Sequence, residues 1–431
     1  MQKKFKESFR KGTFTRNLSV VMTGTAIAQL IMFAMMPIVS RLFTPADFGI
    51  YGSFSAVLGV LTAVATLQYS QAVVLPKRQA DAINLLWVTF LSIIFVVIIS
   101  AAVISVFPDA TQRIINAPNK WFLLLIILAV FVTGFNQSFQ AWCIREKAFK
   151  STSLSQIFRS VTAISIWIAA GFWHMGALGL ALGIVLADSV ASLNLWKVTR
   201  KDLKENHAIV TWQRVQKLAR EYKDFPLFAA PQHVMNAVSQ GLPVLLLGYY
   251  YGIGIAGAYA FSIRIIQTPM NLIVNPLRQV LFQKASETHN NNGNLYSLFM
   301  KITVGLIAIA FLPCVIIFIW APSIFSFIFG SEWLEAGVYT RWLILWLFAG
   351  FSNVPAVLCA RILRQQRNLF LFDSLVLLSR TVVLVLGGMY WSNITTIISF
   401  SVAGFVLNTI LVIWVGMLLY HNKKIPLQPA V

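Results

Sequence analysis

Four arginines lie inside long apolar stretches of the sequence, at Arg159, Arg264, Arg278 and Arg380. The same stretches hold only two acidic residues, so most of these positive charges have no obvious partner along the chain. Placing an arginine near the centre of a bilayer costs about 2.5 to 3.5 kcal/mol on insertion scales. We therefore expect these side chains to face water, a partner or a ligand rather than lipid.

An anion is the ligand that such arginines would select, because a guanidinium group grips phosphate oxygens through two parallel hydrogen bonds. Arg159, Arg264 and Arg380 are therefore candidates for binding a diphosphate in an internal cavity. Arg278 lies near the predicted cytoplasmic end of its segment, where a long side chain can reach the interface, and a structural role is favoured. For Arg380 the alternative is an ion pair with Asp373, but seven residues of helix separate the two by about 10 Å.

The two acidic residues, Asp188 and Asp373, are candidates for binding a coupling proton or sodium ion. A hydrogen bond from Asp188 to a serine or asparagine of a neighbouring helix is an equally good explanation, and Asp373 has the same ambiguity.

Amide side chains in the apolar stretches have donors and acceptors suited to sugar hydroxyls, although each could instead join two helices. The candidates for the substrate cavity are Gln68, Gln140 and Gln267. The full set is Gln29, Gln68, Gln71, Asn136, Gln137, Gln140, Asn236, Gln240, Gln267 and Asn271.

No pattern in the sequence indicates an enzyme. The glycine-rich loop that holds nucleotide phosphates is missing, and the five histidines and three cysteines show no metal-binding spacing. We therefore expect no catalytic activity, no metal and no cofactor other than a coupling H+ or Na+. Basic residues fall between apolar runs instead of on one soluble face, which also disfavours nucleic acid as a partner.

The composition indicates which elements position these residues. Of the 431 residues, 58% are hydrophobic and only 11% are charged, and the mean hydropathy is +0.74. About 20 helical residues cross a bilayer, so the sequence predicts an all-α polytopic membrane protein with twelve spans. The predicted spans are 17–40, 48–70, 82–107, 121–142, 151–172, 177–196, 227–250, 255–283, 302–320, 339–360, 369–391 and 394–419.

Charge asymmetry predicts the orientation of these spans. With twelve spans, 26 of the 34 lysines and arginines fall on one side, which should be cytoplasmic and should hold both termini. The predicted parts are a basic N-terminus (1–16), an N-lobe (17–196), a cytoplasmic linker (197–226), a C-lobe (227–419) and a tail (420–431). The linker is expected to be partly an amphipathic helix near anionic headgroups, or a plain connector.

The two predicted lobes show weak internal similarity. Gly49 and Tyr51 match Gly257 and Tyr259 at one offset, and Arg159 matches Arg380 at another. Each pair falls in corresponding spans of the two halves, which favours two related six-helix lobes around a central cavity.

Five segments resemble a known family in the order in which they occur: PIVSRLFTPADFGIYGSFSAV, WCIREKAFKSTS, GALGLALGIVLADSV, YAFSIRIIQTPMNLIVNPL and FIFGSEWLEAG. They are similar to the Wzx-type polysaccharide (O-antigen) flippases of the multidrug/oligosaccharidyl-lipid/polysaccharide exporter superfamily. The resemblance covers nearly the whole chain.

The resemblance implies a flippase of the bacterial inner membrane that works by alternating access. Its expected substrate is an oligosaccharide repeat unit, of O-antigen above all, on undecaprenyl diphosphate. The diphosphate would travel in the cavity past Arg264, Arg159 and Arg380, while the lipid tail stays in the bilayer between spans 1 and 8. Expected partners are membrane lipids and the polymerase and chain-length regulator of the pathway.

One departure from the family concerns ion coupling. Span 7 holds His233 and Asn236 but no acid, whereas relatives often use acids in spans 7 and 11. Two alternatives stay open, a small-molecule exporter of the same superfamily and a membrane polymerase of the same pathway.

Overall fold

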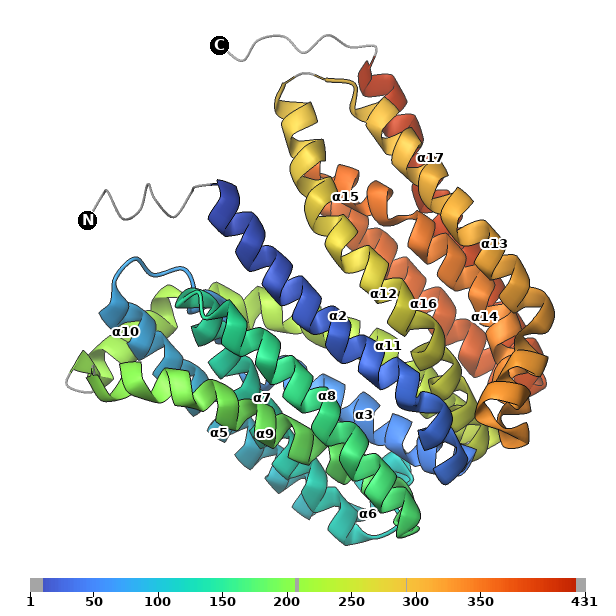
Figure 1. The fold of residues 1–431 in the computed structure, drawn as a ribbon, viewed down its shortest axis with the longest axis horizontal. Helices are drawn as coiled ribbons and strands as arrows, with labels where there is room; N and C mark the ends of the chain where they lie inside the picture. Colours follow the sequence, from blue (N-terminus) through green and yellow to red (C-terminus); the bar gives the residue numbers. More distant parts are fainter. Residues whose placement is uncertain (1–10, 206–208, 292, 424–431) are drawn as a thin grey trace. The chain divides into compact units, whose positions relative to one another are not determined.

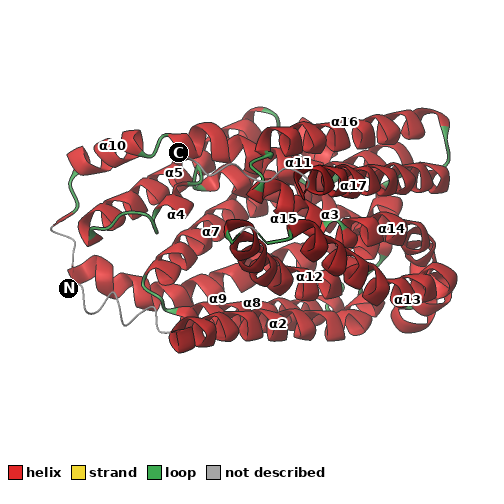
Figure 2. Cartoon of the chain, turned by 90° about the horizontal axis from the view of Figure 1, so that it is seen from above, coloured by secondary structure: helices red, strands yellow, loops and turns green. Residues whose placement is uncertain are grey.

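The computed structural model describes residues 11–205, 209–291 and 293–423. These ranges form helices joined by short connections and contain no strand (Figure 2). The chain divides into two compact units, residues 1–249 and 250–431. The fold is therefore all-α, as predicted, and each unit is described separately.

The first unit contains the helices α2 to α11 (Figure 1). Two of them, α4 and α6, are short helices between longer ones. A π-helical turn, Phe225–Ala229, leads into α11, whose last two residues belong to the second unit. The helices are α2 (Lys11–Leu42), α3 (Pro45–Ala65), α4 (Tyr69–Ala72), α5 (Gln79–Val106), α6 (Pro108–Ile115), α7 (Lys120–Arg145), α8 (Phe149–Phe172), α9 (Gly176–Glu205), α10 (Trp212–Glu221) and α11 (Ala230–Tyr251).

The described residues of the second unit form six α-helices and one 3-10 turn, Ser331–Trp333. One predicted span, 339–360, is broken at Asn353, where one helix ends and the next begins with Pro355 in its first turn. The helices are α12 (Ile253–Asn290), α13 (Leu295–Phe329), α14 (Leu334–Ser352), α15 (Val354–Ile362), α16 (Gln366–Tyr390) and α17 (Asn393–Lys423).

Ten stretches of the described chain are long and apolar enough to cross a membrane. Helices α11 and α12, which correspond to predicted spans 7 and 8, are not among them. Both carry several amides, and α12 also holds Arg264, Arg278 and two prolines. The multi-pass membrane fold is thus established, while the number twelve and the two-lobe symmetry stay predictions.

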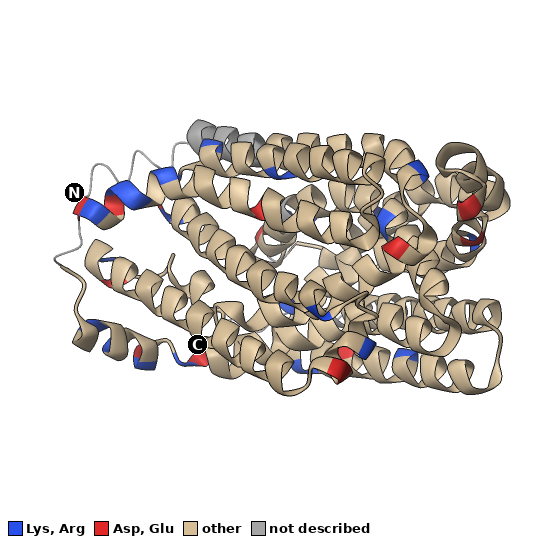
Figure 3. Ribbon diagram, turned by 90° about the horizontal axis from the view of Figure 1, so that it is seen from below, with Lys and Arg blue, Asp and Glu red and all other residues tan. Residues whose placement is uncertain are grey.

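Charged residues are sparse along these helices. Figure 3 shows long tan stretches of ribbon in which only a few turns carry Lys, Arg, Asp or Glu. An arginine inside such a stretch is therefore an exception that needs its own explanation.

The start of α3 shows how local sequence fixes an element. Thr44 caps the helix by accepting from the Asp47 backbone N–H, and the Asp47 side chain accepts from the Thr44 N–H at 3.0 Å. Pro45 fits the first helical turn because its missing N–H is not needed there. The other Asp47 oxygen accepts from the Ala177 N–H at 3.1 Å, which ties the start of α3 to the start of α9.

The predicted cytoplasmic linker is structured where it is described. Helix α10 buries Val215 and Leu218 in the apolar cluster around Trp142 and Leu86, and the Tyr69 hydroxyl donates to the Ala219 carbonyl at 2.9 Å. The apolar face of α10 therefore packs against other helices of the first unit.

Helices α8 and α9 pack closely because glycine is present at the contact. A Cβ at Gly183 would lie 2.4 Å from two ring atoms of Trp167, whose indole N–H donates to the Leu180 carbonyl at 3.0 Å.

We expect Gly183→Ala to lower the stability of the first unit by about 1 to 3 kcal/mol, because the Trp167 ring must move from a packed position. Gly59→Ala is the matched control, since a Cβ there meets nothing within 4 Å. Thermal unfolding of the solubilised protein checks this. Equal melting temperatures for the two variants would contradict the packing argument.

Candidate functional site

The first polar centre lies in the first unit and joins Arg159 on α8 to Asp188 on α9. The Arg159 Nε donates to the Asp188 carboxylate in a direct ion pair. The Asp188 side chain is 3% exposed and that of Arg159 is 44% exposed. The pair therefore has a buried acid and a half-exposed base.

Helix α7 completes this centre. The Thr133 hydroxyl donates to the second Asp188 oxygen at 2.8 Å. Asn136 donates to the Ser192 hydroxyl at 3.1 Å, and Gln140 donates to the Asn136 side-chain oxygen at 2.6 Å. Polar side chains thus connect three helices across the interior of the unit.

These contacts correct the expectation that Arg159 is an unpaired cation. The sequence offered no basic residue one turn from Asp188 on its own helix, but the partner comes from the preceding helix. Asp188 compensates the charge of Arg159 in this structure, and the anion-binding role of Arg159 stays a prediction. Gln140, a predicted sugar ligand, is joined to Asn136 in this structure.

The second centre lies in the second unit around Arg380 on α16. Its guanidinium carbon is 3.9 Å from the ring centre of Trp346 on α14 and 4.1 Å from that of Phe400 on α17. The Phe400 ring also contacts the Tyr259 ring of α12 edge to face, with 6.2 Å between centroids. The Trp346 and Phe400 rings also contact each other edge to face, with 5.6 Å between centroids. The cation therefore packs over two touching rings, which attract it electrostatically.

Arg380 lacks a carboxylate partner in the described part of the chain. The residue is 9% exposed, and its buried Nε–H has no hydrogen-bond acceptor there. Buried charges in proteins are ordinarily paired. Among the described residues Arg380 is thus a buried cation with aromatic neighbours and no acid, and its role in anion binding stays a prediction.

Asp373 does not pair with Arg380. Asp373 is exposed near the start of α16, and the cation that acts on it is Arg361 of α15. The structure therefore agrees with the expectation that seven residues of helix keep Asp373 and Arg380 apart.

The remaining predicted residues are placed as follows. Arg264 and Gln267 lie half-buried on α12, one turn apart, and the Thr268 hydroxyl donates to the Arg264 carbonyl at 2.7 Å. Gln68 is buried in the break between α3 and α4, in a left-handed conformation with φ 60°. It donates to the Ala63 carbonyl at 2.6 Å and accepts from Gln71 at 2.7 Å. Gln68 thus stabilises its own turn in this structure, and its sugar-binding role stays a prediction.

The sequence did not predict that Trp346, Phe400 and Thr133 belong to these two polar centres. Aromatic and hydroxyl residues are common in membrane spans, so nothing in their local spacing marks them. A signal exists only for Arg380 itself, because a buried arginine requires some compensating group. In the described residues no group of three or more His, Cys, Asp and Glu lies together in a way that could hold a metal.

The fold of the chain is similar to the folds of solved membrane transporters. It superimposes on an inward-facing multidrug resistance MATE family transporter of the MOP superfamily with a TM-score of 0.72 at 12% identity, over 93% of this chain and all of that one. It is also similar to the lipid II flippase MurJ in an inward closed conformation, with a TM-score of 0.67 at 13% identity, over 93% of this chain and 90% of that one. At such low identity these likenesses establish the fold.

The chain belongs to the polysaccharide biosynthesis protein family, which it matches over residues 38–338. It is 22% identical over 343 residues to the succinoglycan biosynthesis transport protein ExoT of Rhizobium meliloti, across 78% of this chain and 66% of that protein. It is also 22% identical over 307 residues to an uncharacterized membrane protein in the cps region of Klebsiella pneumoniae, across 70% of this chain and 61% of that protein. The chain spans less than two thirds of the length of either relative. The predicted relationship to polysaccharide flippases is confirmed at the level of the family.

Proposed function

We propose that the protein is a flippase that moves an undecaprenyl-diphosphate-linked oligosaccharide across the bacterial inner membrane by alternating access. The observation that carries this proposal is Arg380, a buried guanidinium that packs over two aromatic rings and has no acidic partner among the described residues. A diphosphate crossing the membrane would lose its hydration, and such a cation would replace part of it.

The family supports a saccharide as the cargo. One relative is named as a succinoglycan transport protein, and the other lies in a cps region. For this chain we therefore propose the repeat unit of an exported polysaccharide as the cargo, without singling out O-antigen. Membrane lipids and the polymerase and chain-length regulator of that pathway are its proposed partners.

Ion coupling is proposed to act through Asp373 in preference to Asp188. Both oxygens of Asp188 are already engaged by Arg159 and Thr133, so an ion would have to displace a salt bridge. Asp373 is exposed, and among the described residues its carboxylate has no hydrogen-bond partner and only Arg361 as an electrostatic partner.

We expect Asp373→Asn to remove the dependence of transport on a proton or sodium gradient, because an amide cannot be deprotonated and carries no charge. Asp188→Asn should keep that dependence. Transport into vesicles with and without an imposed gradient measures this. If Asp188→Asn lost the dependence on the gradient and Asp373→Asn kept it, the coupling site would be Asp188 instead.

Deletion of the gene tests the proposed function in the cell. Lipid-linked saccharide should accumulate on the inner leaflet, surface polysaccharide should disappear, and the gene supplied in trans should restore both. Saccharide accumulating on the outer leaflet would indicate a polymerase instead. Increased resistance to cationic drugs on overexpression, with normal polysaccharide in the deletion strain, would indicate a small-molecule exporter.

A further inference from the structure

Helix α11 carries a row of exposed amides. Gln232, Asn236 and Gln240 are four residues apart, which places them on the same side of the helix. All three are exposed, and none has a hydrogen-bond partner among the residues that the structure describes. These amides therefore do not join helices in this structure.

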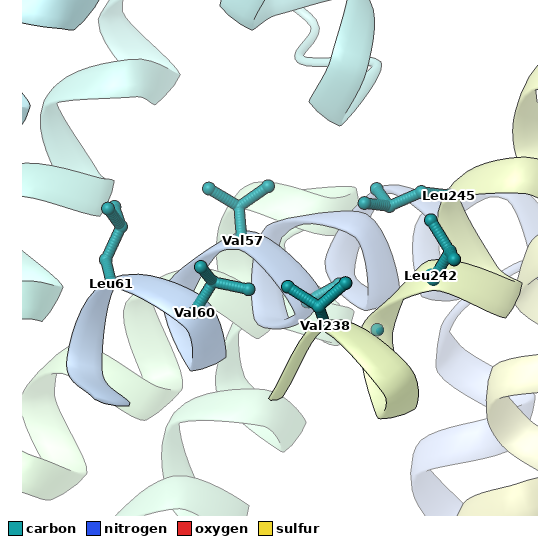
Figure 4. Close-up of a pocket in the computed structure, with 8 residues that line it drawn as sticks. Val57, Val60, Leu61, Val238, Leu242 and Leu245 are labelled. Carbon is teal, nitrogen blue, oxygen red and sulfur yellow. The ribbon is translucent and has the colours of Figure 1, made fainter. Parts of the chain in front are cut away.

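The other side of α11 is apolar and faces α3. Val238, Leu242 and Leu245 line a pocket of about 160 Å³ with Val57, Val60 and Leu61 of α3 (Figure 4). The helices come closest at Gly241, where a Cβ would lie 2.8 Å from the Ala56 Cβ. At 3.6 residues per turn, this apolar side lies roughly opposite the amide row. Helix α11 is thus held to the first unit by one side and presents its amides on the other.

The amide row cannot be a lipid-facing surface. Placing an amide without a hydrogen-bond partner in hydrocarbon costs free energy. Three such amides on one side of the helix would each add this cost. Helix α11 also falls outside the stretches that are apolar enough to cross a membrane on their own. Gln71 of α4 extends the polar surface, because its amide lies 3.0 Å from the His233 ring nitrogen next to the row. The amide side must border water or a polar ligand.

We propose that Gln232, Asn236 and Gln240 form a binding surface for the sugar hydroxyls of the cargo, an inference that rests on the proposed function. An amide donates and accepts, and a sugar hydroxyl does both as well. The row contains no charged side chain, so it matches the uncharged part of the cargo and leaves the diphosphate to arginine. Successive amides rise about 6 Å along the helix, so one saccharide can contact more than one of them.

The test compares two probes on the full-length protein in nanodiscs. One is undecaprenyl diphosphate, and the other is the lipid-linked saccharide extracted from the deletion strain. The double variant Asn236→Leu/Gln240→Leu should bind the saccharide-bearing probe about tenfold more weakly, since two hydrogen bonds are lost. Its affinity for undecaprenyl diphosphate should not change. Leu242→Met, on the apolar side, should alter neither affinity.

Three outcomes would overturn the inference. Unchanged affinity of the double variant for the saccharide-bearing probe would do so, even if transport were lost, because the amides would then serve a helix contact. An equal loss of affinity for both probes would show that the amides do not bind the sugar. A wild-type protein that binds neither probe would refute the proposed function itself. Gln232→Met repeats the comparison at an independent position should the double variant fail to fold.

Discussion

Replacing Arg380 with methionine is expected to slow transport of the lipid-linked saccharide by about a hundredfold or more, because two charged hydrogen bonds to the diphosphate are lost. Methionine keeps a long flexible side chain over the Trp346 and Phe400 rings, and its sulfur packs well against aromatic rings. The variant therefore removes the charge while preserving the contact between α14, α16 and α17. Arg380→Ala should abolish transport as well, but it also opens a void.

Two controls separate charge from packing. Arg380→Lys keeps the charge but loses the planar, two-pronged geometry, so we expect an intermediate rate. Arg367→Ala removes an exposed arginine from the first turn of the same helix and should leave transport unchanged. Surface polysaccharide, normalised to the amount of protein in the membrane, is the measurement. A normal rate for Arg380→Met would show that the cation serves only helix packing.

Removing Arg159 is expected to destabilise the first unit by about 1 to 3 kcal/mol, less than the 3 to 5 kcal/mol typical of a fully buried pair, because the arginine is half exposed. Arg159→Leu leaves the Asp188 carboxylate buried with only Thr133 to satisfy it. The double variant Arg159→Leu/Asp188→Leu removes both charges and should recover much of the lost stability.

Thermal unfolding of the solubilised variants provides this comparison. We expect the double variant to melt at a higher temperature than the single variant Arg159→Leu. If the stability losses of the single variants Arg159→Leu and Asp188→Leu add, the double variant melts at a lower temperature than either. That result would show that the ion pair contributes little to stability. Retained transport in the double variant would further assign this centre a structural role, in line with its engaged carboxylate.

The elements were largely predictable from the sequence, because bilayer thickness alone sets the length of an apolar helix. The predicted segment 121–142 corresponds to α7, and 151–172 corresponds to α8. The breaks were not predictable to the same degree. Span 48–70 ends early as a helix, at Ala65, because Leu67 and Gln68 adopt positive φ values. Local side-chain hydrogen bonds, such as the one from Gln68 to the Ala63 carbonyl, stabilise that turn, and the residue types alone do not indicate them.

The candidate site was predictable only as a list of residue types. Buried charge is costly, so the sequence correctly marks Arg159 and Arg380 as residues that need compensation. It cannot say which compensation occurs, since the partners lie far along the chain. Asp188 is 29 residues from Arg159, and Trp346 and Phe400 reach Arg380 from other helices. Two arginines that match in a sequence repeat thus have different surroundings, one paired with an acid and the other stacked on aromatic rings.

The most direct measurement is translocation by the purified protein in vesicles of defined lipid. Lipid-linked saccharide from the deletion strain is incorporated into these vesicles, and a membrane-impermeant reagent reports the fraction in the outer leaflet over time. The proposed flippase function requires that wild-type protein exchange the saccharide between leaflets far faster than vesicles without protein do, and that Arg380→Met lose this activity. Exchange no faster than in protein-free vesicles, or equal exchange by wild type and Arg380→Met, would contradict it.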